Sequence, residues 1–357
     1  MKLSNYIVII LISGIFLISA VNTFGFHEGG VANCKGCHII HDSEDGMDVT
    51  PETADGNLYL LKGEQPSDVC LACHATSNGA VFSLDPLNPD PEKGAGNFTF
   101  LLEDNINDGP DGITNIIPGF HAGHNIVAPS LGLLADPNNT SAPGGTFVSS
   151  ELSCTSCHDP HGNTNFRMLY GVGQIQNNTY NFVYPAPDAI GIDFKNSSET
   201  NSNHTAYLSG MSEWCANCHG LDYHENNLSD IDHHAPTSFK TGFVNRYNLY
   251  NGTNDESGGT AATAYLPEVP FEDPTNSISR TQGPTTGSTI MCLSCHRAHA
   301  TSSPAAGRWD FNVEFLQQDG VNSNSYPIPN PYDNAQQESL CKKCHMGNFM
   351  GTEILNQ

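Results

Sequence analysis

Cys34-Lys35-Gly36-Cys37-His38 is the first of six copies of the pattern Cys-x-x-Cys-His in this chain of 357 residues. The other five copies are Cys70-Leu71-Ala72-Cys73-His74, Cys154-Thr155-Ser156-Cys157-His158, Cys215-Ala216-Asn217-Cys218-His219, Cys292-Leu293-Ser294-Cys295-His296 and Cys341-Lys342-Lys343-Cys344-His345. Together they use all 12 cysteines of the chain. Because one such motif is the attachment signature of a c-type haem, the sequence predicts six covalently bound haem c groups.

Each residue of the motif has a role in this chemistry. The two thiols form thioethers with the two vinyl groups of one haem, and the histidine that follows is the proximal ligand of its iron. The predicted proximal ligands are His38, His74, His158, His219, His296 and His345. Disulfides are an alternative in an exported chain, but they do not require a histidine at one offset in every copy. Zinc is disfavoured because its Cys-x-x-Cys pairs seldom carry histidine at the next position.

The N-terminal segment predicts export. A short basic start precedes an apolar run over residues 6–18, which is typical of a secretory signal peptide at 1–25. An uncleaved membrane anchor is the alternative, although the run is short for a membrane span. Residues 26–357 are then expected to form a single hexahaem cytochrome c domain, without a membrane span after cleavage. Export agrees with the haem motifs because thioether attachment takes place outside the cytoplasmic membrane.

The composition predicts a fold with little regular structure. Hydrophobic residues make up 38% of the chain, below the roughly 45–50% of typical globular proteins. Six porphyrins would supply the missing apolar surface, so the chain is expected to be mostly irregular coil wrapped around a continuous haem stack. Short α-helices are expected at the motifs, together with a few short strands. Residues 97–100 and 180–184 alternate with period two and are the candidate strands.

The charge of the chain restricts its partners. Asp and Glu number 38 against 13 Lys and Arg, which gives a formal net charge of −25. This balance argues against nucleic acid and anionic lipid, both of which need basic patches. It is compatible with cationic partners or metal ions.

The histidines that remain distinguish an electron carrier from an enzyme. Ten of the 16 histidines lie outside the motifs: His27, His41, His121, His124, His161, His204, His224, His233, His234 and His299. They are numerous enough to give every iron a second axial histidine, and an iron closed in this way has no open site for a substrate. All six motifs end in histidine, which favours an electron carrier with no catalytic residues. A multihaem reductase with one five-coordinate haem is the alternative from a different class.

Three of these histidines follow a proximal histidine by three residues. They are His41, His161 and His299. A histidine so close in sequence cannot cross to the far face of its own haem, but it can reach an adjacent one. The spacing therefore predicts that neighbouring haems are tied together.

The segments around the motifs resemble the hexahaem c-type outer-surface cytochromes of the extracellular cytochrome nanowire family. The resemblance is collinear along residues 26–345 and extends beyond the motifs. It includes Phe26-His27-Glu28-Gly29-Gly30-Val31-Ala32, the segments 123–128, 142–146, 156–162 and 292–300, and Gly210-Met211-Ser212-Glu213-Trp214 before the fourth motif. The chain lacks the extra histidines that follow the second motif in that family, which leaves the ligation of the second haem open.

The resemblance implies bis-histidine ligation throughout and head-to-tail assembly into a filament. It implies that His41 binds the Cys292/Cys295 haem of a neighbouring subunit. The distal ligands that it suggests are His27, His124, His161, His234 and His299, with His224 as a seventh candidate for six places.

The resemblance also implies where the protein works and with what. It implies a secreted protein of the outer cell surface, with the periplasm as an alternative location. Its partners would be other copies of itself, other multihaem cytochromes and an extracellular electron acceptor such as a metal oxide. A soluble monomeric electron shuttle remains an alternative to the filament.

Overall fold

The computed structural model describes residues 34–41, 43–44, 47–48, 59–75, 81–84, 94–102, 106–108, 115–117, 121–176, 180–192, 199–220, 236–252, 258–311, 313–316, 320–321, 326–327, 331–332, 334 and 336–345. All six motifs lie within these residues. The predicted signal peptide and three of the predicted distal ligands, His27, His224 and His234, lie outside them.

The helices are short. The α-helices are α2 (Cys34–Cys37), α3 (Pro66–His74), α4 (Cys154–Cys157), α5 (Met211–His219) and α7 (Thr241–Leu249). The 3-10 helices are η1 (Phe98–Leu102), η3 (Pro129–Leu131), η4 (Ser149–Glu151), η5 (Phe166–Met168), η6 (Ala261–Thr263), η7 (Cys292–Ser294), η8 (Pro304–Ala306) and η10 (Leu340–Lys343). Within the described residues the longest helices have nine residues.

The strands are shorter still, and they pair only antiparallel. They are β1 (Ser43–Glu44), β2 (Met47–Asp48), β3 (Ile106–Asp108), β4 (Asn115–Ile117), β5 (Ile175–Gln176), β6 (Tyr180–Asn181), β7 (Asp188–Ile190), β8 (Ala206–Ser209), β9 (Thr237–Ser238), β10 (Thr289–Ile290), β11 (Gly320–Val321) and β12 (Tyr326–Pro327). The described sheets are the pairs β1–β2, β5–β6, β7–β8 and β9–β10 and one four-stranded sheet in the order β12-β11-β3-β4. The prediction of a mostly irregular chain with short elements is confirmed.

One of the two candidate strands is wrong. Residues 98–102 form the 3-10 helix η1, in which Phe98, Thr99 and Phe100 are all buried. Alternation predicts a strand only when its two faces meet different surroundings, and here successive side chains share the same interior. The other candidate is confirmed only at its start, since β6 covers Tyr180–Asn181.

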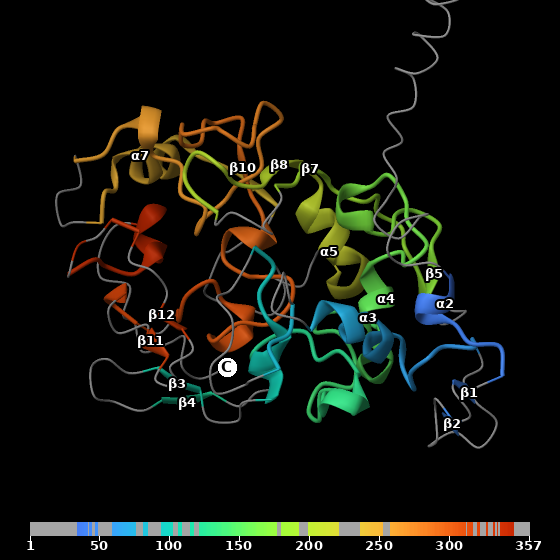
Figure 1. The fold of residues 1–357 in the computed structure, drawn as a ribbon. Coiled ribbons are helices and arrows are strands. Elements are labelled where there is room, and N and C mark those ends of the chain that lie inside the picture. Colours follow the sequence, from blue (N-terminus) through green and yellow to red (C-terminus); the bar gives the residue numbers. More distant parts are fainter. Residues whose placement is uncertain are drawn as a thin grey trace, which may run out of the picture.

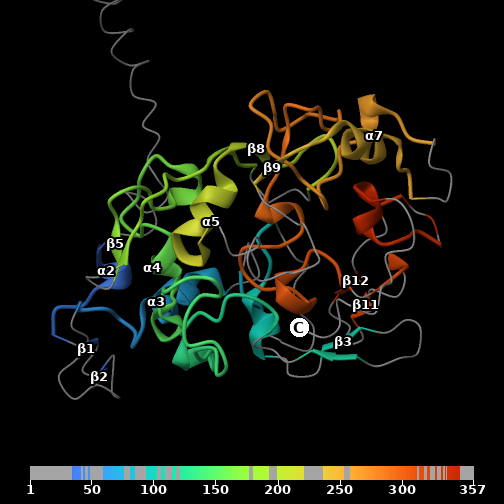
Figure 2. The same cartoon turned by 180° about the vertical axis from the view of Figure 1, so that it is seen from behind.

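The motifs form a row across the molecule. Figure 1 shows α2 in blue at one side, then α3, α4 and α5, then the orange segments that contain η7, and the red C-terminal segments at the opposite side. Figure 2 shows the same order from behind. Three separate hydrophobic clusters line this row, and cysteines of the motifs pack at their edges: Cys154 in one, Cys215 in another, and Cys295, Cys341 and Cys344 in the third. No helix in the described part of the chain is long and apolar enough to cross a membrane.

Candidate functional site

Each motif forms about one helical turn that closes on its histidine. The histidine N–H donates to the carbonyl of the first cysteine in four motifs, over 2.8 Å for His38 and 3.0 Å for His158, His296 and His345. In the third and fifth motifs a serine inside the motif caps this turn. The Ser156 hydroxyl accepts from the Ser153 N–H at 3.0 Å, and the Ser294 hydroxyl from the Met291 N–H at 3.1 Å. The turn therefore holds both thiols and the imidazole close together.

None of the twelve cysteines forms a disulfide, so all are available for thioether bonds. Thiols of successive motifs lie beside one another. The Cys70 sulfur lies within hydrogen-bonding distance of that of Cys154, and the Cys215 sulfur within the same distance of that of Cys292. Cys157 lies near Cys218, and Cys295 lies near Cys341. With Cys37 next to Cys73, these neighbours order the six motifs in space as in sequence.

The second and third motifs are joined in the same way as the fourth and fifth. The Ser67 hydroxyl on α3 accepts from the Cys154 N–H at 3.2 Å, and the Ser212 hydroxyl on α5 accepts from the Cys292 N–H at 3.0 Å. Both serines stand three residues before the first cysteine of their own motif. Sequence reasoning missed these residues, although the shared offset was a signal for them.

The proximal histidines are oriented through Nδ1. His38 Nδ1 lies 3.0 Å from the Tyr59 carbonyl, His158 Nδ1 2.9 Å from that of Arg167, and His296 Nδ1 2.8 Å from that of Ala305. His219 Nδ1 lies 3.0 Å from the Pro143 carbonyl. A carbonyl accepts only from N–H, so these bonds place the proton on Nδ1 and leave the Nε2 lone pair for a metal.

The first, third and fifth motifs share one backbone arrangement. A returning segment forms an isolated antiparallel bridge with each proximal histidine: Leu61 with His38, Leu169 with His158 and Gly307 with His296. Residues just before these bridges have positive φ: Leu60 (57°), Arg167 (50°), Met168 (57°), Ala305 (56°) and Ala306 (53°). Non-glycine residues rarely adopt this conformation, and such strain is found where function requires it. Here it directs a carbonyl to the Nδ1 of each proximal histidine.

Three proximal histidines face one of the predicted distal ligands. The ring centres of His38 and His161 lie 6.4 Å apart, those of His158 and His299 6.4 Å, and those of His219 and His124 5.8 Å. A metal–imidazole bond is about 2 Å, so two rings that bind one iron from opposite faces have centres about 6 Å apart. The first two pairs match the separation for a haem iron between the rings, and the His219–His124 pair is slightly closer.

The distal member of the fourth-motif pair is held by the fifth motif. His124 Nδ1 lies 2.8 Å from the Ala298 carbonyl, and His124 Nε2 lies 3.5 Å from His219 Nε2. Gly123 permits the close approach of this segment to the backbone at His299, because a Cβ at residue 123 would lie 2.1 Å from the His299 carbonyl. Burial lowers the pKa of His124 to about 4 and that of His299 to about 3. Both rings are therefore neutral at neutral pH, which is the form that binds a metal.

The remaining histidines of the described part fall into two kinds. His41, which belongs to the predicted ligand set, and His121 are exposed. His204 is fully buried and stacks on Tyr265 with ring centres 3.7 Å apart. Its Nδ1 lies 3.0 Å from the Thr205 carbonyl and its Nε2 2.8 Å from the Arg280 carbonyl. Both nitrogens are occupied, so His204 is a structural residue.

Replacing His204 with phenylalanine is expected to destabilise the protein without changing its haem spectrum. The change keeps the stacked ring but removes the ring N–H that donates to a buried carbonyl, which costs about 1–3 kcal/mol. Thermal unfolding and the visible absorption spectrum measure the two effects. The appearance of a high-spin band in this variant would contradict the structural role.

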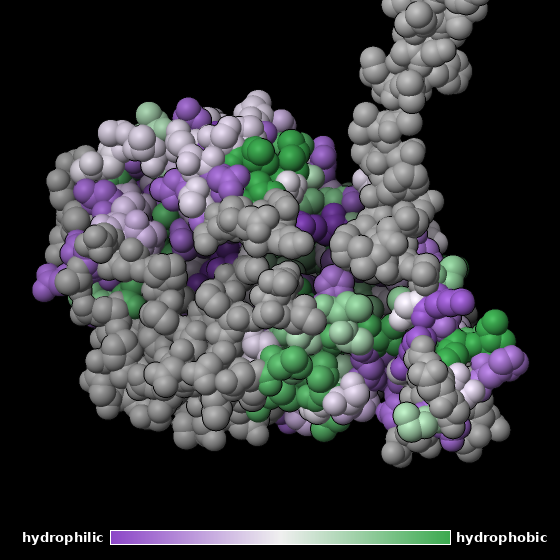
Figure 3. Space-filling view, in the orientation of Figure 1, coloured by the Kyte–Doolittle hydropathy of each residue, from purple (hydrophilic) through white to green (hydrophobic). Residues whose placement is uncertain are grey.

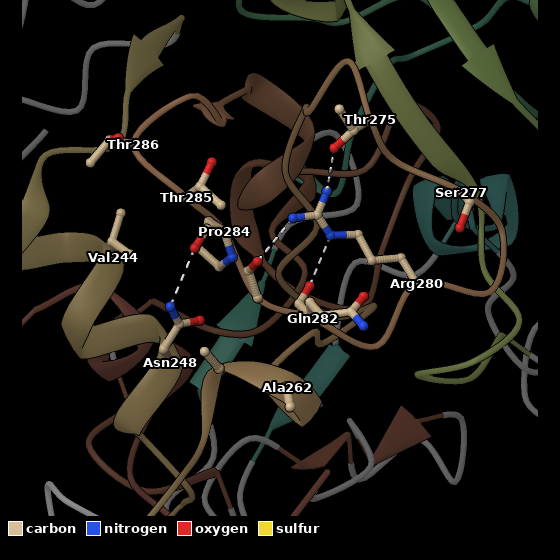
Figure 4. Close-up of a pocket in the computed structure, with 12 residues that line it drawn as sticks. Val244, Asn248, Ala262, Thr275, Ser277, Arg280, Gln282, Pro284, Thr285 and Thr286 are labelled. Carbon is tan, nitrogen blue, oxygen red and sulfur yellow. Dashed lines mark hydrogen bonds between the residues drawn. The ribbon is translucent and has the colours of Figure 1, made fainter.

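A pocket beside α7 is separate from the motifs. Its volume is about 620 Å³, and none of the cysteines or candidate ligands lines it. Figure 4 shows Arg280 at its wall, where the guanidinium donates to the Gln282 and Gly283 carbonyls at 3.0 Å. Arg280 also pairs with Asp273 at 3.0 Å, so its charge is used within the fold.

Comparison with known proteins identifies similar sequences. Residues 147–179 match the family model of the doubled CXXCH motif. The chain is 30% identical to the C-type cytochrome OmcS of Geobacter sulfurreducens over 419 residues, which cover 92% of this chain and 96% of that protein.

Two solved structures have the same fold. One is a cryo-EM structure of the OmcS nanowires from Geobacter sulfurreducens, with a TM-score of 0.70 and 27% identity. The other is the outer membrane cytochrome S filament from the same organism, with a TM-score of 0.73 and 29% identity. Each match covers 90% of this chain and 99% of the other.

The motifs, the oriented histidines and the relatives define a multihaem cytochrome with covalently bound c-type haems. Within that class, the chain belongs to the family of the C-type cytochrome OmcS.

Proposed function

We propose that this protein is an exported electron carrier, not an enzyme, whose six bis-histidine haems form one continuous chain, and that its subunits join head to tail into an extracellular filament. The observation that carries the proposal is the pairing of His38 with His161 and of His158 with His299. Bound haem supplies one-electron exchange between ferric and ferrous iron. The protein holds these groups close together and closes their axial positions.

The two pairings follow one rule. His299 stands three residues after the fifth proximal histidine and faces the third, and His161 stands three residues after the third and faces the first. His41 stands three residues after the first proximal histidine. In both pairings the histidine faces the motif two places earlier in the chain. No motif lies two places before the first one, so by the same relation His41 faces a motif of a neighbouring subunit. Two places before the first motif in a head-to-tail row is the fifth motif of that neighbour, which contains His296.

The surface around His41 supports contact with a second copy. Ile40 is 76% exposed, Met47 72%, Tyr59 67% and Leu60 48%. They belong to the segments around the first motif, and Figure 3 shows apolar residues on the side of the molecule where α2 lies. Large apolar side chains gathered at one end of a protein mark an interaction site. A neighbouring subunit bound there also makes the non-closing interface that a filament requires.

The proposed ligand set is His27, His41, His124, His161, His234 and His299, with His224 as a further candidate. His124, His161 and His299 are supported by their distances to proximal rings. The other electron partners that we propose are multihaem cytochromes and an external acceptor such as a metal oxide. A net charge of −25 suits contact with cationic or metal-rich surfaces.

Replacing His161 or His299 with alanine tests the ligand pairing. Each change removes one distal ligand, so one haem of the six is expected to become five-coordinate and high-spin. His121→Ala is the matched control, because His121 is exposed and is outside the proposed set. Electron paramagnetic resonance and absorption spectra of the purified holoprotein count the high-spin haems. A fully low-spin His161→Ala or His299→Ala protein would overturn the pairing, and a high-spin haem in each subunit of the unaltered, assembled protein would favour the reductase alternative.

A further inference from the structure

The sixth motif contains two buried lysines between its cysteines, Lys342 and Lys343. Lys343, the second spacer residue, has an exposed fraction of 0%. The residues at the same place in the other five motifs are Gly36, Ala72, Ser156, Asn217 and Ser294, none of which carries a charge. A buried lysine is uncommon unless its charge is satisfied or has a function. The environment of its Nζ atom therefore decides what this residue does.

The surroundings of Lys343 favour its positive form. Nζ donates to the carbonyls of Tyr247 at 2.9 Å, Ala264 at 3.0 Å and Tyr250 at 3.5 Å. It also lies 4.2 Å from the centre of the Tyr247 ring and 5.3 Å from that of Tyr332. An ammonium supplies three donors, and aromatic faces attract cations. Three acceptors and two rings thus surround the charge.

The charge of Lys343 is not paired with a carboxylate of the described residues. The contrast with Lys342 is direct, because Lys342 Nζ lies 3.6 Å from Glu338. Glu268 is near enough to act on Lys343, but burial raises the pKa of Glu268 and favours its neutral form. Arg246 adds a second buried cation, since its Nε donates to the Lys342 carbonyl at 3.0 Å. The local charge at the sixth motif is therefore positive.

A fixed positive charge acts on a nearby redox centre in one direction. Reduction adds an electron to the centre and lowers its positive charge by one. A cation in a medium of low dielectric constant interacts unfavourably with the oxidised state and so favours reduction. Lys343 is such a cation, since its side chain is buried and its Nζ atom is held by three carbonyls.

We propose that Lys343 raises the reduction potential of the haem at the sixth motif and makes that haem the preferred site for an electron within the subunit. Lys343 is a tuning residue, since it acts on the haem without binding the iron. This role depends on haem attachment and is independent of filament assembly, so either can fail without the other.

The test compares variants of Lys343 that lose the positive charge with a variant that keeps it. Lys343→Gln and Lys343→Met remove the charge, whereas Lys343→Arg keeps it. Lys35→Gln is the control, because Lys35 is an exposed lysine inside the first motif. The haem content of each holoprotein is measured first. An anaerobic redox titration of the visible absorption then follows all six haems.

In the neutral variants one of the six haems is expected to become at least about tenfold harder to reduce, a shift of about 59 mV for one electron. Lys343→Arg and Lys35→Gln are expected to titrate like the unaltered protein. An unchanged titration in a fully loaded neutral variant would refute the tuning role. Loss of haem from both neutral variants, with normal loading of Lys343→Arg, would assign Lys343 to folding and overturn the proposal as well.

Discussion

Replacing His41 with alanine is expected to abolish filaments while leaving six haems in each subunit. In the proposed series His41 completes the coordination of an iron in the neighbouring copy, so its loss removes a metal bond from the subunit contact. Changes next to a metal ligand already cost about 10–100-fold in metal affinity, and loss of the ligand itself should weaken the contact by at least as much. Negative-stain electron microscopy of purified protein measures filament length and number.

Two controls separate assembly from folding in this experiment. His121→Ala changes another exposed histidine and should leave filaments intact. The haem content and thermal stability of the His41→Ala subunit should match those of the unaltered subunit. Its dispersed subunits should also contain one high-spin haem, at the fifth motif. Filaments of normal length in the His41→Ala protein would exclude the proposed inter-subunit ligand.

Removal of haem is expected to unfold most of the chain. The described hydrophobic core is divided into three clusters, and cysteines of the motifs pack at the edges of each. With 38% hydrophobic residues and helices of at most nine residues in the described part, the polypeptide lacks the apolar area to offset its own entropy. We expect the porphyrins to connect these clusters. Circular dichroism of chain made without haem attachment should therefore show no cooperative thermal transition.

A graded version of this experiment removes single haems. Cys154→Ala with Cys157→Ala deletes the attachment of the third haem, in the interior of the row, and Cys34→Ala with Cys37→Ala deletes that of the first, at its end. The interior deletion should lower the Tm more than the deletion at the end, and each kcal/mol of lost stability corresponds to about 1–2 °C in a chain of this length. A haem-free chain that unfolds cooperatively, or equal losses from the two deletions, would contradict the role of haem as the core.

The sequence was sufficient for the motifs, because one helical turn fixes the relative positions of the two thiols and the imidazole. The offset of three residues predicted contact with adjacent haems, whereas His161 and His299 face motifs two places earlier in the chain. The composition likewise predicted a chain with little regular structure.

Other features could not be predicted because they depend on contacts distant in sequence. The gaps between motifs are irregular, which conceals the arrangement shared by the first, third and fifth motifs. The returning segment pairs 11 residues after His158 and His296 but 23 residues after His38. His204 resembles a spare ligand until its two carbonyl partners are seen. Lys343 is one of two adjacent buried lysines, and only the contacts of its Nζ atom distinguish it from Lys342, which is paired with Glu338.

The central claim is that the haem chain continues from one subunit into the next through His41. Cryo-electron microscopy of the native protein tests it most directly, because the map shows each axial ligand and the subunit from which it comes. We expect a filament in which His41 binds the iron at Cys292 and Cys295 of a neighbouring copy, opposite His296. A map of separate particles, or of a filament in which a histidine of the same subunit occupies that position, would contradict it.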